Sequence, residues 1–167
     1  MAIDTLWGYI FKNKKHSDNI ELLKNIPIFS TLQFFDLKKL SKLLHLRRFY
    51  PNEIVFRENE PAQSLYIVRS GMIKVHTQNK VGDEVELALL EEGMFFGEVA
   101  LVDESPRSAS AVALEKTELL GLLRSDLMNL TDRDPRLASL ILLQLSRIVS
   151  HRLRETNRAM HKLTRKP

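Results

Sequence analysis

The stretch FFGEVALVDESPRSASAV, residues 95–112, decides how the rest of this sequence is interpreted. Residues 97–101 interrupt a series of strand-like segments and are too few for a strand of their own, so we expect one helical turn that Gly97 opens. The start of a helix presents free backbone N–H groups and a partial positive charge, which suit a phosphate. Glycine there also removes the side chain that would block close approach of a ligand.

Two charged residues give this stretch its chemistry. Arg107 follows Pro106 and is expected to open the next strand, where its guanidinium can hold two oxygens of one phosphate in a fixed geometry. Ionised Glu98 only accepts hydrogen bonds, which suits the hydroxyl of a sugar. The combination indicates a sugar phosphate as ligand. The alternative is a solvated loop in which Glu98 and Arg107 form a surface ion pair that contributes little stability.

The sequence around this stretch predicts an antiparallel β structure. Short aliphatic or β-branched segments, separated by turn residues, are expected to be strands at residues 48–50, 54–57, 65–70, 72–77, 84–90, 108–114 and 118–123. No long helical segment lies between them to provide the crossovers of a parallel sheet. The predicted fold class is α+β: an antiparallel jelly roll, or double-stranded β-helix, with N-terminal helices and a long C-terminal helix.

Helices are expected ahead of the strands. Residues 19–24 and 36–46 predict two short ones, the second with Asp36 as its N-cap. An amphipathic helix is expected before them, and its apolar face consists of Ile3, Leu6, Trp7, Ile10 and Phe11. Lysines follow that face, so contact with a membrane surface is one interpretation, and packing on the barrel or on a partner is the other.

Helices are also expected after the strands. Ser125 is expected to cap a short helix, and Asp134 followed by Pro135 predicts the start of a long one that runs to about residue 164. The chain then divides into an amphipathic extension at residues 1–25, the β-roll at residues 26–133 and the long helix at residues 134–167.

The pattern F-G-E-x-A-L, an acidic loop and then P-R-S-A resembles the phosphate-binding cassette of cyclic nucleotide-binding domains. This family includes catabolite activator protein, protein kinase A regulatory subunits and cyclic nucleotide-gated channels. The resemblance runs from about Ile26 to the C-terminus and includes the segments NIPIFSTLQ, YIVRSG and EEGMFFGE. Asn59 and Pro61-Ala62 depart from it, because many members have glycines there. Asparagine tolerates left-handed backbone geometry, so we expect the turn to survive.

The resemblance implies a role for each polar group of the cassette. Glu98 would bind the ribose 2′-hydroxyl, and Arg107 would bind the exocyclic oxygens of the cyclic phosphate. Gly97 would open the turn. The other implied phosphate contacts are the backbone amides near Glu98, Val99 and Ala100, the amide of Ala109 and the hydroxyl of Ser108.

Few residues bear on the identity of the base. Members that prefer cGMP often carry threonine directly after the arginine, so Ser108 favours cAMP over cGMP as the ligand. Leu87 and Ala88 are expected to carry the base on a strand, with plain core packing as the alternative. In the family, the helix that follows the barrel serves as the lid.

The long C-terminal helix carries a repeat typical of a coiled coil, formed by Val149, Leu153, Thr156, Met160 and Leu163. We expect a homodimer through this helix, and packing on its own barrel is the alternative. The segment HRLRETNRAM resembles the dimer helix of the catabolite activator group, where polar residues of both subunits reach the adenine amino group. The resemblance implies Thr156 and Asn157 for this contact, and setting the helix register is the alternative role of Thr156.

Composition excludes several classes of function. The chain has 167 residues and no cysteine, which excludes thiolate catalysis, zinc ribbons and iron–sulfur clusters. The five histidines are scattered, and no Ser/His/Asp arrangement or carboxylate pair is evident, so neither an enzyme nor a metal site is expected. No apolar run of 18 residues predicts a membrane-spanning helix, and we expect a cytoplasmic protein.

The expected function is that of a non-catalytic cyclic nucleotide sensor that signals by helix rearrangement to an unidentified protein effector. Two alternatives stay open: a ligand-binding fragment of a transcription regulator, or the same fold with an idle pocket that acts as a scaffold. No DNA-binding domain is expected, because the sequence stops directly after the long helix. Residues 134–167 carry eight basic and two acidic side chains, so binding of DNA through this helix is a further alternative.

Overall fold

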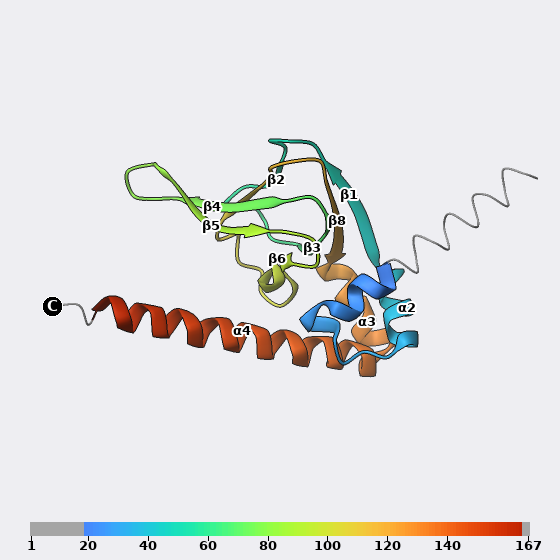
Figure 1. The fold of residues 1–167 in the computed structure, drawn as a ribbon. Helices are drawn as coiled ribbons and strands as arrows, with labels where there is room; N and C mark the ends of the chain where they lie inside the picture. Colours follow the sequence, from blue (N-terminus) through green and yellow to red (C-terminus); the bar gives the residue numbers. More distant parts are fainter. Residues whose placement is uncertain (1–18, 165–167) are drawn as a thin grey trace, which may run out of the picture.

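The computed structural model describes residues 19–164 (Figure 1). The predicted amphipathic helix at the N-terminus and the last three residues lie outside this range. After helical residues 19–25 come η1 (Pro27–Phe29), α2 (Phe34–Ser41), β1 (Leu44–Phe49), β2 (Ile54–Phe56), β3 (Ser64–Ser70), β4 (Ile73–Gln78) and β5 (Glu84–Leu90). The second half consists of β6 (Phe95–Phe96), η2 (Glu98–Leu101), β7 (Ser110–Ala113), β8 (Thr117–Leu123), α3 (Arg124–Arg133) and α4 (Pro135–Thr164).

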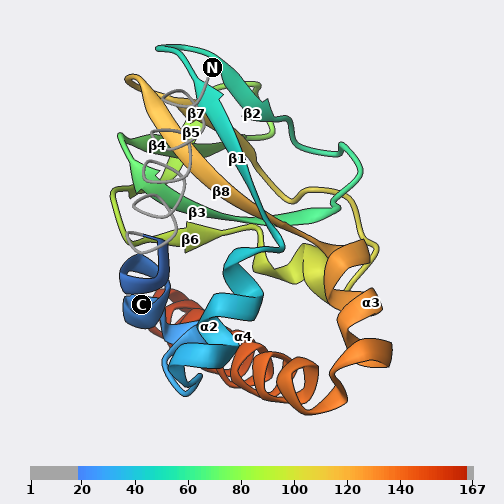
Figure 2. The ribbon, with the colours of Figure 1, turned by 90° about the vertical axis from the view of Figure 1, so that its right-hand side faces the viewer.

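The strands form two four-stranded antiparallel sheets with the orders β1-β8-β3-β6 and β2-β7-β4-β5. Figure 2 shows the strands gathered above the helices, with α2, α3 and α4 below them. This arrangement confirms the predicted fold class, an α+β jelly roll with helices at its N-terminal side and a long C-terminal helix.

Two hydrophobic clusters hold these layers together. The first joins the helices to the sheet of β1, β8, β3 and β6, and its fully buried members include Leu23, Leu40 and Ile141. The second lies between the sheets around Val68, Ile73 and their neighbours. Burial of apolar side chains on both sides of one sheet fixes that sheet between the helices and the second sheet.

The prediction of a helix over residues 36–46 was wrong at both ends. Gln33 is the N-cap of α2, while Asp36 sits at the third helical position and completes a capping box with Gln33. The helix ends at Ser41, and Leu44 begins β1, whose residues pair with β8. Leucines in this run fit the helical period, but pairing with β8 decides the outcome from Leu44 onward, because tertiary contacts override a weak local preference.

Three other boundaries differ from the sequence prediction. Ser125 caps no helix: α3 begins at Arg124, and its N-cap Leu123 offers no side-chain hydrogen bond. The strand expected over residues 108–114 begins at Ser110, so Arg107 lies in the loop before β7 rather than opening the strand. β6 was missed, because two residues are too few to produce a periodic pattern.

The long helix α4 begins and ends where the sequence predicts. Pro135 is its first residue, and the Asp134 carboxylate accepts a hydrogen bond from the backbone N–H of Leu137 at 3.1 Å. Its first half packs against the other helices, whereas residues 150–158 are exposed. Figure 1 shows α4 running along one side of the β-roll. No helix among residues 19–164 is long and apolar enough to cross a membrane.

Candidate functional site

The predicted helical turn is present as η2, and Gly97 opens it. Gly97 has φ of 72°, a left-handed conformation that non-glycine residues rarely adopt. A Cβ atom at this position would lie 2.5 Å from Nη1 of Arg107 and 3.1 Å from the carbonyl oxygen of Ser64. Glycine is therefore required at this position for two reasons: the backbone is left-handed, and Arg107 approaches too closely for a Cβ atom.

Arg107 is almost entirely buried, with 7% of its surface exposed. Its Nη2 donates hydrogen bonds to the carbonyl oxygen of Ser64 at 2.9 Å and to the Ser64 hydroxyl at 3.2 Å. Its Nε atom is buried and has no hydrogen-bond partner among residues 19–164. Burial lowers the pKa of the Arg107 guanidinium, because desolvation disfavours its charged form. A charged group without an ion-paired carboxylate in the described chain is thus available to an anionic ligand.

The backbone of Arg107 is held by the turn after β2. Its N–H donates to the carbonyl oxygen of Glu60, and its own carbonyl accepts from the N–H of Asn59, each at 2.8 Å. Asn59 has φ of 68°, as expected for an asparagine that replaces glycine in a left-handed turn. The departure from the family pattern at this turn therefore leaves the arginine in place.

An aromatic stack packs against the Arg107 guanidinium. The Cζ atom of Arg107 lies 4.0 Å from the centre of the Phe56 ring, within the range of a cation–π contact. Phe56 in turn lies 6.1 Å from Tyr66 and 5.8 Å from Phe96, measured between ring centres. Because β2 belongs to one sheet and β3 and β6 to the other, the stack joins both sheets next to the arginine.

Glu98 is the second buried charged residue, with 5% of its surface exposed. Its carboxylate pairs with the guanidinium of Arg152 on α4, and the Cζ atom of Arg152 lies 5.2 Å from the centre of the Phe95 ring. The alternative of a solvated Glu98–Arg107 surface pair is wrong, because both side chains are buried and Arg107 bonds to Ser64 instead. Sequence reasoning missed Arg152, since no spacing rule connects it to a residue so distant in the sequence.

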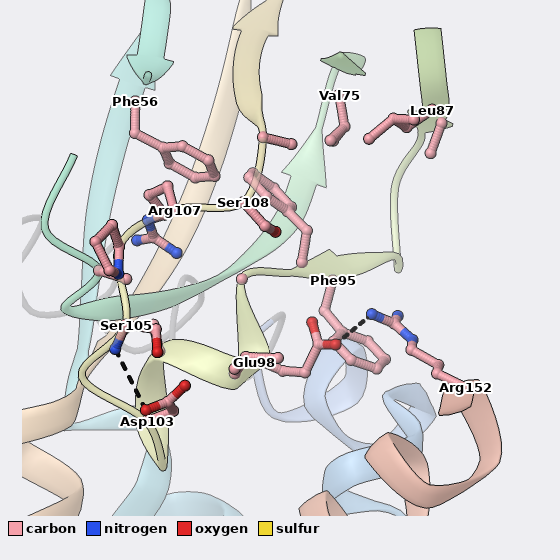
Figure 3. Close-up of a pocket in the computed structure, with 18 of the residues that line it drawn as sticks. Phe56, Val75, Leu87, Phe95, Glu98, Asp103, Ser105, Arg107, Ser108 and Arg152 are labelled. Carbon is pink, nitrogen blue, oxygen red and sulfur yellow. Dashed lines mark hydrogen bonds and ion pairs between the residues drawn. The ribbon is translucent and has the colours of Figure 1, made fainter. Parts of the chain in front are cut away.

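These groups line a cavity of about 620 Å³ (Figure 3). Of the sequence-predicted residues, those that line it are Gly97, Glu98, Val99, Ala100, Arg107, Ser108, Ala109, Leu87 and Ala88. Thr156 and Asn157 are not among the lining residues and are exposed on α4. The Thr156 hydroxyl donates to the carbonyl oxygen of Arg152 at 2.9 Å, a bond within its own helix.

One wall of the cavity is apolar. Val75, Leu87 and Leu90 contribute to it from β4 and β5, and Figure 3 shows Val75 and Leu87 on a different side from Glu98. Leu87 is 55% exposed, so the interpretation of this residue as plain core is wrong. A cavity with a cationic end and an apolar wall suits a ligand that has both an anionic and a flat apolar part.

A third carboxylate, that of Asp103, also lines the cavity. Hydrogen bonds from Ser105, first from its hydroxyl and then from its backbone N–H, lower the pKa of Asp103. The Asp103 carboxylate therefore accepts hydrogen bonds from its own loop (Figure 3). Among residues 19–164, no group of three or more histidine, aspartate or glutamate side chains could hold a metal ion.

Comparisons with known proteins agree with this geometry. The family model for the cyclic nucleotide-binding domain matches residues 46–134. The cyclic AMP receptor protein of Thermus thermophilus is 43% identical over 112 residues, which is 66% of this chain and 50% of the receptor. A cAMP-dependent protein kinase regulatory subunit of Pyricularia oryzae is 29% identical over 115 residues, or 69% of this chain and 28% of the subunit. The chain thus spans half or less of the length of these relatives.

A solved structure shows the same fold. The crystal structure of the Thermus thermophilus catabolite activator protein matches with a TM-score of 0.76 and 36% sequence identity, over 83% of this chain and 63% of that one. The family match covers more than half of the chain and includes η2, Glu98 and Arg107. This chain therefore belongs to the cyclic nucleotide-binding domain family, in the branch related to cyclic AMP receptor proteins.

Proposed function

We propose that this chain is a non-catalytic sensor that binds a cyclic nucleotide in the cavity, cAMP in preference to cGMP, and signals through α4 to a protein effector. The observation that carries the proposal is the state of Arg107. Its guanidinium is buried, its Nε has no partner, and no carboxylate forms an ion pair with it among the described residues. A buried charge is costly unless it is paired, so an anionic ligand at this position would supply the missing partner of Arg107.

The nucleotide occupies the cavity in one orientation. The cyclic phosphate lies against Arg107, Ser108 and the first backbone N–H groups of η2. The start of a helical turn carries a partial positive charge, which attracts an anion. The ribose 2′-hydroxyl donates to the Glu98 carboxylate. The base lies on the apolar wall at Leu87 and Ala88, where flat apolar surface removed from water contributes to affinity.

Support for cAMP comes from two observations. Ser108 stands where members that prefer cGMP often have threonine, and the relative with 43% identity carries cyclic AMP in its name. The proposed preference depends on the base and not on the phosphate, because both nucleotides present the same cyclic phosphate to Arg107.

Signalling follows from the contact of Glu98 with Arg152. A ribose hydroxyl at Glu98 shares the carboxylate that α4 already uses, so binding changes the free energy of the docked position of α4. A ligand shifts an equilibrium only by its differential affinity for the two states, here α4 docked and α4 rearranged. Sharing of the Glu98 carboxylate makes the ligand affinity differ between them.

Homodimer formation through α4 is part of the proposal. Residues 150–158 are exposed, and Leu153 on this half of the helix exposes 60% of its surface. Together with half-buried Val149 it begins the coiled-coil repeat, and a partner helix would cover it. Thr156 and Asn157 would then reach the base from the dimer interface. The effector is a protein that recognises the rearranged helix.

Calorimetric titration with cAMP and with cGMP tests the ligand. We expect micromolar cAMP binding by the wild type, and a loss of about a hundredfold in Arg107→Leu, since a charged hydrogen-bond pair contributes roughly 1.5–3 kcal/mol per bond. Arg107→Lys keeps the positive charge but loses the paired N–H donors of the guanidinium. Its cAMP affinity is expected to fall between those of the wild type and Arg107→Leu. Arg57→Leu is the control, because Arg57 is exposed and is not among the residues that line the cavity.

Absence of heat with both nucleotides on the wild-type chain would contradict the ligand proposal. Equal loss in Arg57→Leu and Arg107→Leu would show that the effect is not specific to the cavity. Equilibrium sedimentation with and without cAMP tests the dimer, and Leu153→Glu is expected to give a monomer.

A further inference from the structure

One face of α2 presents aromatic and cationic side chains to the outside. Phe34 and Phe35 expose 59% and 73% of their surface, and their rings lie 5.7 Å apart in an edge-to-face arrangement. Lys38, Lys39 and Lys42 are exposed on the same helix or at its C-cap. Contiguous exposed aromatic side chains beside cationic ones are unusual on a surface that contacts only water.

The helical period explains why these five side chains share one face. Phe34, Lys38 and Lys42 follow at intervals of four residues, and Phe35 and Lys39 form the neighbouring row. The opposite face carries Leu37 and Leu40, which belong to the core. We call Phe34, Phe35, Lys38 and Lys42 the α2 surface, because Lys39 has a partner within the chain.

Two ion pairs fix the orientation of the α2 surface. Lys39 donates to the Asp134 carboxylate at 2.5 Å, and Arg136 pairs with the buried carboxylate of Asp36. Asp134 directly precedes α4 and Arg136 is its second residue, so both pairs tie α2 to the start of α4. They hold the helix with its phenylalanines facing outward. The pairs also cancel the negative charge of this region, because Asp36 and Asp134 are both occupied.

The remaining charge on the α2 surface is positive. Lys38 and Lys42 form no ion pair among the described residues, so an anionic partner meets no opposing carboxylate on this helix. Aromatic rings beside lysines suit the boundary between lipid headgroups and acyl chains, where rings insert and ammonium groups meet phosphates. A stable protein interface involves roughly 20–30 residues a side, far more than this small patch provides.

The chain enters the described part of the structure next to α2. Leu23 belongs to the same core cluster as Leu37 and Leu40, and Figure 2 shows residues 19–25 beside α2. The preceding 18 residues have the same chemistry in their sequence. They contain Ile3, Leu6, Trp7, Ile10 and Phe11, followed by Lys12, Lys14 and Lys15. The sequence therefore contains two stretches in which aromatic residues are followed by lysines.

We propose that the α2 surface docks onto a bilayer that contains anionic lipids. Phe34 and Phe35 insert at the level of the headgroups, and Lys38 and Lys42 contact lipid phosphates. None of the four residues of the α2 surface lines the sensor cavity.

Co-sedimentation of the full chain with vesicles tests the proposal. Wild type is expected to bind vesicles of phosphatidylcholine with a quarter phosphatidylglycerol, and to bind pure phosphatidylcholine more weakly. The double variant Phe34→Ser/Phe35→Ser is expected to reduce partitioning by about tenfold, because two rings no longer leave water. Tyr50→Ser is the matched control, since Tyr50 is an aromatic residue of similar exposure elsewhere on the surface.

A second pair of variants tests the contribution of the lysine charges to vesicle binding. Lys38→Gln/Lys42→Gln is expected to lose about fivefold per lysine on anionic vesicles, the fold-change for a lysine near an anionic surface. Lys80→Gln, an exposed lysine at the tip between β4 and β5, is the control. Binding to neither vesicle by the wild type would overturn the proposal and would leave an acidic protein as the occupant. Equal binding by the α2 variants and the controls would overturn it too.

The fluorescence of Trp7 distinguishes docking of the α2 surface onto a membrane from docking of residues 1–18 onto the α2 surface. It is the single tryptophan of the protein, so its fluorescence reports only on the N-terminal segment. We expect Phe34→Ser/Phe35→Ser to leave the emission of the vesicle-free protein unchanged. A red shift in this variant without vesicles would show that residues 1–18 cover the α2 surface, and the proposal would be overturned.

Discussion

Arg152 of α4 pairs with Glu98 of η2, although the two residues are 54 positions apart in the sequence. The pair ties the exposed half of the long helix to a buried carboxylate in the cavity. Glu98 is nearly inaccessible to water, so its partner offsets part of the cost of burying its charge. The pair is thus the direct physical connection between the proposed ligand site and the proposed output helix.

Removal of Arg152 is expected to loosen α4. In Arg152→Leu the Glu98 carboxylate stays buried without its partner, which costs about 1–3 kcal/mol of the free energy of unfolding. We expect faster hydrogen exchange over residues 150–158 and a lower urea midpoint. Arg158→Leu is the control, because its ion pair with Glu155 lies within α4. Unchanged exchange in Arg152→Leu would show that the pair does not hold the helix.

Gly97→Ala is expected to damage both stability and ligand binding. The left-handed backbone costs alanine about 1–2 kcal/mol, and the new Cβ displaces the Arg107 guanidinium. Gly93→Ala is a matched control, because Gly93 has φ of 82° but open space around its Cβ position. Both variants should therefore lose stability in urea, Gly97→Ala by more because of the clash, while only Gly97→Ala loses cAMP affinity, by at least tenfold. Equal affinities of the two variants would refute the displacement of Arg107.

Phe56→Leu is expected to weaken cAMP binding about fivefold. The substitution removes the ring that contacts the Arg107 guanidinium, and a cation–π contact contributes about 0.5–2 kcal/mol. Phe56→Tyr keeps the ring and should keep most of the affinity. Phe49→Leu is the control, because Phe49 packs in the same inter-sheet cluster but makes no cation–π contact with Arg107. If Phe49→Leu and Phe56→Leu weaken binding equally, the ring acts only through general packing.

The helical turn at Gly97 was predictable from the sequence because its residues are neighbours along the chain. Gly97, Glu98 and Arg107 lie within eleven consecutive residues, and the turn they form needs only a glycine conformation and short loops. The fold class was predictable for the same reason, since short segments separated by turn residues indicate strands without knowledge of their pairing.

The contacts that complete the cavity were not predictable. Phe56 and Arg152 reach the cassette from β2 and α4, and their positions follow from tertiary packing rather than from any local spacing. The end of α2 shows the same limit: Leu43 and Leu44 fit a helical face, yet Leu44 pairs with Leu122 of β8. Long-range pairing determines the outcome wherever two local patterns fit equally well.

Asp134 makes the stability of the α2–α4 junction depend on pH. The hydrogen bond from Lys39, and then that from the backbone N–H of Leu137, lower the pKa of the Asp134 carboxyl in the folded state. A lowered folded-state pKa means that its contribution to stability is complete above the unfolded-state pKa and is lost as the pH falls through the folded one. Asp134→Asn should therefore lower the melting temperature at pH 7, and the difference from wild type should shrink in strongly acidic buffer. Asp132→Asn, at an exposed position of α3, is the control, and a difference for Asp134→Asn that stays constant down to acidic pH would contradict the role of the charge.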